Sequence, residues 1–154
     1  MTGDASMEVR ELPLAQANEK LQELYREYVE AVSKNDYDRA LELGSEIVEE
    51  LLRLAHEYVI PSLTTPLARS VASKIVSHHE KALAFVKGAR EAAKSTPVLY
   101  SFGVKEKAVE VLTATINGLF SFVMGALIVL SDILAIRRAS EQKREKNNLV
   151  PRVL

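Results

Sequence analysis

The three histidines, His56, His78 and His79, are the first side chains to weigh for chemistry, because imidazole binds metals and carries protons near neutral pH. Imidazoles and carboxylates on facing helices build metal sites in helical bundles, usually with a glutamate three residues before the histidine. None of these histidines has a glutamate at that position. The spacing therefore favours hydrogen-bonded structural histidines, and a small-ligand or metal site at these residues stays an alternative.

Other catalytic patterns are missing from the sequence. The chain has no cysteine, which excludes disulfides, cysteine–zinc sites and thiol nucleophiles. The glycine-rich nucleotide-binding loops, the zinc-protease helix motif and the nucleophilic serine elbow of hydrolases do not occur either. We therefore predict no catalytic residue and no cofactor, and we favour a non-enzymatic protein.

Charged residues offer two further candidates. Asp132 follows a long apolar run, where an unpaired carboxylate costs several kcal/mol. We therefore expect it to form an ion pair or hydrogen bond near a bundle end, with Arg137, Arg138 or a basic residue of another subunit as its partner. Basic residues recur over residues 66–94, but Glu80 and Glu91 interrupt them and no aromatic side chains accompany them for base stacking. Nucleic-acid binding is therefore not expected.

The net charge of −1 hides an uneven distribution. Residues 1–60 carry fourteen acidic and six basic side chains, whereas residues 61–154 carry seven acidic and fourteen basic ones. The basic side chains are interleaved with acidic ones rather than clustered. We therefore expect the two halves to dock on each other, within one chain or between chains.

Repeating apolar residues predict an all-α chain with four helices, over about residues 14–34, 37–59, 66–94 and 104–140. Pro13 suits the first turn of the first helix, Lys34–Asn35–Asp36 offers a cap to the second, and Thr65–Pro66 opens the third. Residues 141–154 are expected to form a polar, frayed tail. Together these helices predict a single up-and-down four-helix bundle domain over residues 1–154.

The hairpin formed by the first two helices resembles a single tetratricopeptide unit, through Leu21, Leu24, Tyr25 and residues 35–41. That family repeats about every 34 residues, and the pattern does not recur at that distance in this chain. The resemblance therefore implies a tight helical hairpin and no peptide-binding groove of that family.

Each of the first three helices has an apolar face that should point into the core. In the first helix this face is Leu14, Ala17, Leu21, Leu24, Tyr28 and Ala31. In the second it is Tyr37, Ala40, Leu41, Ile47, Val48, Leu51, Ala55, Tyr58 and Val59. In the third it is Leu67, Val71, Ile75, His78, Ala82, Phe85, Ala89 and Ala93. This placement predicts that His78 is an interior residue.

The fourth helix contains twenty-one consecutive uncharged residues, Val111 to Ser131. At ~1.5 Å per residue this run spans about 31 Å, enough to cross a bilayer core of ~30 Å, so a single membrane span through residues 111–131 is an alternative. Against it, the chain has no tryptophan, and Phe120 and Phe122 lie in the middle of the run instead of at its ends. The basic residues after the run, Arg137, Arg138, Lys143, Arg144 and Lys146, outnumber Lys105 and Lys107 before it and would hold the C-terminal side in the cytoplasm. A span would then require export of the N-terminal hundred residues without a signal peptide.

A stripe of mostly small residues on the fourth helix predicts close contact with another helix. The expected interface residues are Ala114, Asn117, Gly118, Ser121, Phe122, Gly125, Ile128 and Asp132. Three neighbours within one chain would leave this side uncovered, so we expect the helix to lie at the core of a homo-oligomer. The sequence thus predicts a cytoplasmic protein that assembles with itself.

Overall fold

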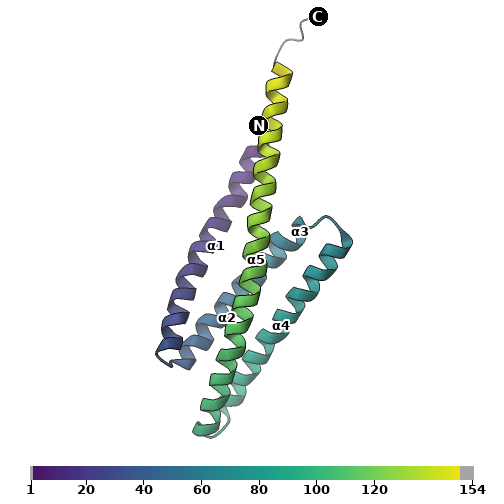
Figure 1. Cartoon of the computed structure of the whole chain (residues 1–154). Coiled ribbons are helices and arrows are strands. Elements are labelled where there is room, and N and C mark those ends of the chain that lie inside the picture. Colours follow the sequence, from purple (N-terminus) through teal and green to yellow (C-terminus); the bar gives the residue numbers. More distant parts are fainter. Residues whose placement is uncertain (1, 150–154) are drawn as a thin grey trace, which may run out of the picture.

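The computed structural model describes the backbone of residues 2–149 and the side chains of residues 16–98, 102–133 and 135–147. The long helices are α1 (Thr2–Ser33), α2 (Tyr37–Leu54), α4 (Pro66–Lys94) and α5 (Val98–Leu149). Between α2 and α4 lie a π-helix, η1 (Ala55–Val59), and the short α3 (Ile60–Ser62). The described residues hold no strand, and the four long helices pack together (Figure 1), so the predicted all-α class is confirmed.

Local sequence signals begin two of these helices. Asn35, in the turn before α2, has a φ of 56°, a left-handed conformation that asparagine tolerates better than most residues. Asp36 then caps α2 by accepting a hydrogen bond from the backbone N–H of Arg39 at 3.3 Å. Thr65 caps α4 in the same way, through the backbone N–H of Ala68 at 3.2 Å. Both predicted caps are confirmed.

The π-helix η1 replaces the regular helix expected up to residue 59. The backbone N–H of Ile60 bonds to the carbonyl of Ala55, five residues earlier, which is the spacing of a π turn. Pro61 follows at once, and its ring crowds the carbonyl four residues before it while offering no N–H. A wider turn accommodates the proline, and the chain becomes extended at Leu63.

Two helices are longer than the sequence predicted. α1 begins at Thr2, so Pro13 lies inside it rather than in its first turn. α5 runs from Val98 to Leu149 instead of from 104 to 140, and the connection before it is only residues 95–97. The segment expected to fray is helical up to Leu149 because Glu, Gln, Lys and Arg are strong helix formers. Residues 150–154 of the expected tail lie outside the described residues.

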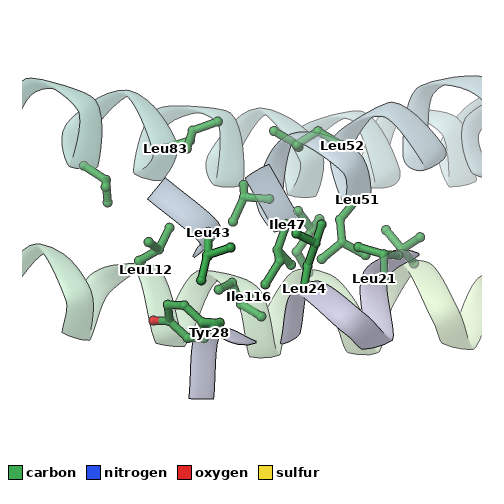
Figure 2. Close-up of a cluster of buried hydrophobic side chains, with 14 of the residues drawn as sticks. Leu21, Leu24, Tyr28, Leu43, Ile47, Leu51, Leu52, Leu83, Leu112 and Ile116 are labelled. Atoms are coloured by element: carbon green, nitrogen blue, oxygen red, sulfur yellow. The ribbon is translucent and has the colours of Figure 1, made fainter. Parts of the chain in front are cut away.

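α2 is the most enclosed helix, because it packs against α1, α4 and α5. Figure 2 shows its side chains between those of the other helices, with Leu43, Ile47 and Leu51 from α2 labelled. Gly44 permits the close approach to α5, since a Cβ there would lie 2.4 Å from Cδ2 of Leu112. The centre of the core is therefore α2 rather than the more apolar α5.

The predicted inner faces of α1 and α2 are confirmed. On α1 the buried residues are Ala17, Leu21, Leu24, Tyr28 and Ala31, and Leu14 lies outside the described side chains. Every residue of the predicted α2 face is buried or half-buried. In both helices the apolar residues form one continuous stripe, so their periodicity identifies a single inner face.

The predicted inner face of α4 is only partly right, because Ala93 is buried and Ile75, Ala82 and Ala89 are half-buried. Leu67 and Phe85 expose 76% and 57% of their surfaces, and Val71 and His78 are exposed as well. The other buried residues of this helix are Ala72, Val76, Leu83 and Val86, none of which belongs to the predicted face. The observed face is rotated by about 100°, one residue step. The apolar residues of α4 cover more than one arc of the helix, and packing against α2 and α5 selects the arc that is buried.

A buried polar contact joins α1 to α5. The hydroxyl of Tyr28 lies 2.6 Å from Oγ1 of Thr113, and Thr113 itself donates to the carbonyl of Val109 at 2.8 Å. Because that bond uses the single hydroxyl proton of Thr113, Tyr28 is the donor of the pair. Burial raises the pKa of Tyr28, and the hydrogen bond with Thr113 offsets part of that rise.

Candidate interaction surface on α5

α5 carries a long face that no other described helix covers. The residues on its inner side, towards α2 and α4, are buried: Ala108, Val109, Leu112, Ile116, Leu119, Val123 and Leu127. Seven residues on the opposite side are exposed, and we call them the outer face: Ala114, Asn117, Gly118, Ser121, Gly125, Ile128 and Asp132. Ile128 exposes 62% of its surface, and only 18% of the most apolar eighteen-residue window of α5 is buried. By length and composition alone, this helix is able to cross a membrane.

The outer face contains seven of the eight residues expected to form an interface. The eighth, Phe122, is half-buried at the edge of that face. The structure therefore gathers the expected residues on one uncovered surface, while their contact with a second copy stays a prediction. The C-terminal part of α5 extends beyond the ends of α2 and α4 (Figure 1), which lengthens the uncovered surface further.

A groove borders the outer face on the side of α1. It has a volume of about 680 Å³ and is lined by Gln22, Tyr25, Arg26, Val29, Asn117, Phe120 and Ser121. Two of these residues, Asn117 and Ser121, also belong to the outer face. The groove was not predicted from the sequence, although Tyr25 and Val29, four residues apart beside the buried stripe of α1, were a detectable signal.

α4 borders the outer face on the other side. A Cβ added at Gly118 would lie 3.4 Å from Cε1 of His79, so His79 faces α5. Glu80 and Lys87 of α4 point instead towards η1 and α2, where they pair with His56 and Glu49. Around the axis of α4, at about 100° per residue, Val71 and Phe85 lie further from the α2-facing side than His79 does, and both are exposed. Exposed apolar side chains of α1, α4 and α5 therefore border one another on this side of the molecule.

The three histidines do not form one site. Nε2 of His56 lies 2.7 Å from Oε1 of Glu80, which links η1 to α4. The rings of His78 and His79 are 5.7 Å apart, but His78 is exposed whereas His79 is half-buried. Burial, together with the nearby His78, lowers the pKa of His79. Among the described residues, no group of three His, Asp or Glu side chains is able to hold a metal ion.

Asp132 does not form the predicted pair within the chain, while pairing with a basic residue of another subunit stays a prediction. Its carboxylate is exposed on the outer face and makes no hydrogen bond or ion pair with the described residues. Leu127 is the last buried residue among the described side chains of α5, and Asp132 lies beyond it, so water solvates its carboxylate. Charge pairing between the two halves of the chain is confirmed elsewhere, by Lys87 with Glu49 at 2.7 Å and Lys105 with Asp38 at 2.9 Å.

This surface offers contact area rather than catalytic groups. In the groove the one charged lining residue is Arg26, and Glu23 already holds its guanidinium group. Comparison of the chain with protein-family models, with curated proteins and with solved structures finds no match. The functional assignment therefore depends on the geometry of the outer face and its borders.

Proposed function

We propose that this chain is a non-enzymatic cytoplasmic protein that assembles with itself through the outer face of α5, with its four long helices forming an up-and-down bundle. The observation that carries the proposal is the low burial of the most apolar window of α5, 18%. Exposed apolar surface costs about 25 cal/mol per Å² in water, and a second copy laid on this face removes it. The groove beside the outer face has a mostly apolar lining, and its one charged side chain is already paired, which supports an interaction role for this surface over an enzymatic one.

A membrane span through residues 111–131 is the second candidate, and the same low burial favours it. The residues that would cross the bilayer also pack on their inner side against α2 and α4. Those two helices carry the ion pair of Lys87 with Glu49, and α4 also pairs with His56 through Glu80. Moving such charges into hydrocarbon costs several kcal/mol per ion, whereas assembly in water leaves them solvated. We therefore favour assembly.

Gly125→Leu tests the role of the outer face. A Cβ at Gly125 meets no atom within 4 Å, so leucine leaves the fold of one chain intact while it blocks close approach of a second α5. By light scattering in detergent-free buffer, the wild-type protein should exceed the 17.1 kDa of one chain, and the variant should shift towards that mass. Gly88→Leu is the matched control, because a Cβ there also meets no atom within 4 Å and Gly88 lies on α4, outside the outer face.

Three outcomes would contradict the proposal. A wild-type protein that is a clean monomer would exclude assembly. Recovery of the protein in the membrane fraction, with release by detergent only, would support the span instead. An assembly of unchanged size in Gly125→Leu would exclude the outer face as the contact.

A further inference from the structure

The groove between α1 and α5 fits an apolar side chain better than a charged ligand. Its volume of about 680 Å³ lies within the ~300–1,000 Å³ of ligand pockets. Tyr25, Val29 and Phe120 supply an apolar lining, and the guanidinium of Arg26 is already held by Glu23. The groove also opens onto the outer face through Asn117 and Ser121, so a partner lying on that face reaches it directly.

Ile128 is the large exposed apolar residue of the outer face. At about 100° per residue it lies on the same stripe of α5 as Asn117 and Ser121. It lies seven residues beyond Ser121, about 10 Å along the axis, so it does not reach the groove of its own chain. A second copy running in the opposite direction, with a two-fold axis close to residues 123 and 124, places its Ile128 opposite residues 117–121.

Two-fold symmetry then fills both grooves at once. The two-fold axis of such a pair is perpendicular to the plane that contains the two α5 helices. The side of α5 that faces α1 in one copy therefore lies next to the same side of α5 in the other copy. The groove lies on that side of α5, and at about 100° per residue Ile128 lies on the stripe of its lining residues Asn117 and Ser121. Ile128 of each copy therefore packs in the groove of the other copy, as expected for an interface formed by the same surface of both copies.

Charge opposes the parallel alternative. In a parallel pair each residue of the outer face meets its own copy, so two Asp132 carboxylates would approach each other within apolar surroundings. Residues 137–147, with five basic and two acidic side chains, would likewise lie beside their own copy.

The antiparallel arrangement removes both conflicts. It separates the two Asp132 side chains and directs residues 137–147 towards the far end of the partner. Residues 23–46, around the turn between α1 and α2, carry seven acidic and three basic side chains at that end. Figure 1 shows this turn and the C-terminal end of α5 at opposite ends of the molecule. Basic and acidic ends are thereby brought together.

We infer that a second copy of this chain docks antiparallel on the outer face of α5, and that Ile128 of each copy occupies the groove between α1 and α5 of the other. The inference depends on the proposed function and adds the orientation of the partner and the residue that it contributes.

Engineered cysteines test the orientation, because the natural chain has none. We would make Asn117→Cys and Ile128→Cys separately, with a tag on one variant, and oxidise each alone and the two mixed. In the antiparallel pair, two copies of residue 128 are about 14 Å apart along the helix axes and two copies of residue 117 about 20 Å. Both separations exceed the ~7 Å limit between the Cα atoms of a disulfide. A cross-link is therefore expected only in the mixture, and Gly88→Cys, on α4, should not cross-link in any sample.

The outcomes separate this inference from the proposed function. An oligomer in which Ile128→Cys cross-links alone keeps self-assembly and overturns the antiparallel arrangement. An oligomer whose mixture gives no cross-link above the Gly88→Cys background overturns it as well. A monomeric wild-type protein refutes the proposed function, and the inference with it.

A second measurement addresses the groove. Ile128→Ala should raise the dissociation constant of the oligomer about tenfold or more, because it removes the buried part of the side chain from the interface. Since Ile128 is exposed in the single chain, the helical content should stay unchanged. An unaltered dissociation constant would exclude Ile128 as the occupant.

Discussion

Replacing Gly44 by alanine tests the close packing of α2 on α5, on which the uncovered position of the outer face depends. A Cβ at this site would lie 2.4 Å from Cδ2 of Leu112 and 2.9 Å from Cε2 of Tyr28. Carbon atoms in contact are normally ~3.5–4.0 Å apart. Leu112 is 0% and Tyr28 2% exposed, and Tyr28 is also held by its hydrogen bond with Thr113. Neither side chain moves aside without disturbing the core.

The expected change in the free energy of unfolding follows from three terms. Adding volume to a well-packed core costs about 1–3 kcal/mol. The higher helix propensity of alanine offsets about 1 kcal/mol of that cost. Displacement of the Tyr28 ring weakens its hydrogen bond, which costs about 1 kcal/mol. We therefore expect Gly44→Ala to lower the free energy of unfolding by about 1–3 kcal/mol.

Urea unfolding followed by far-ultraviolet circular dichroism measures this loss, at one fixed protein concentration because assembly adds to apparent stability. Gly88→Ala is the control, with an expected gain of about 1 kcal/mol, because a Cβ at Gly88 meets no atom within 4 Å. Adding Leu112→Val to Gly44→Ala should cost less than the sum of the two single changes, since the shorter side chain makes room. A Gly44→Ala variant as stable as the wild type would show that α2 and α5 do not approach this closely.

Two further predictions concern the polar groups of the interior. Tyr28→Phe removes the hydrogen bond to Thr113 and should cost about 0.5–1.5 kcal/mol in urea unfolding; a variant as stable as the wild type would show that this bond does not stabilise the contact between α1 and α5. His79 has a pKa below its ordinary value of 6.5 in the folded chain, so the unfolded chain binds its proton more readily. The contribution of His79 to stability is therefore complete above about pH 6.5 and is lost as the pH falls through the lower pKa of the folded state. His79→Gln should flatten the dependence of the free energy of unfolding on pH in this window, and an unchanged dependence would contradict the assignment.

The contrast between α1 and α4 shows what periodicity predicts. On α1 the apolar residues from Ala17 to Ala31 form one narrow stripe, and the structure buries that stripe. On α4, apolar residues such as Val71 and Val76 lie on different arcs, so two inner faces are compatible with the sequence. The structure buries the side of α4 that carries Ala72 and Val76 and leaves Val71 exposed, so packing against other helices decided between the two faces.

The candidate surface was predictable only in part. The small residues of the outer face recur at helical spacing, which identified Gly118, Ser121 and Gly125 before any tertiary contact was known. The groove beside them was not predictable, because its walls come from α1 and α5, about ninety residues apart along the chain. The same limit applies to Gly44, whose importance depends on the distance to Leu112 on another helix.

The sequence by itself determined the helical class, the caps at Asp36 and Thr65, and the presence of more apolar surface on α5 than one chain covers. These properties depend on neighbouring residues and on total composition, which are written directly in the chain. The tertiary structure alone decided that α2 is the enclosed helix, that His79 rather than His78 faces α5, and that a groove opens between α1 and α5. The physical reason is that all three features depend on which side of each helix packs against a neighbouring helix. Contacts between residues far apart along the chain decide that packing.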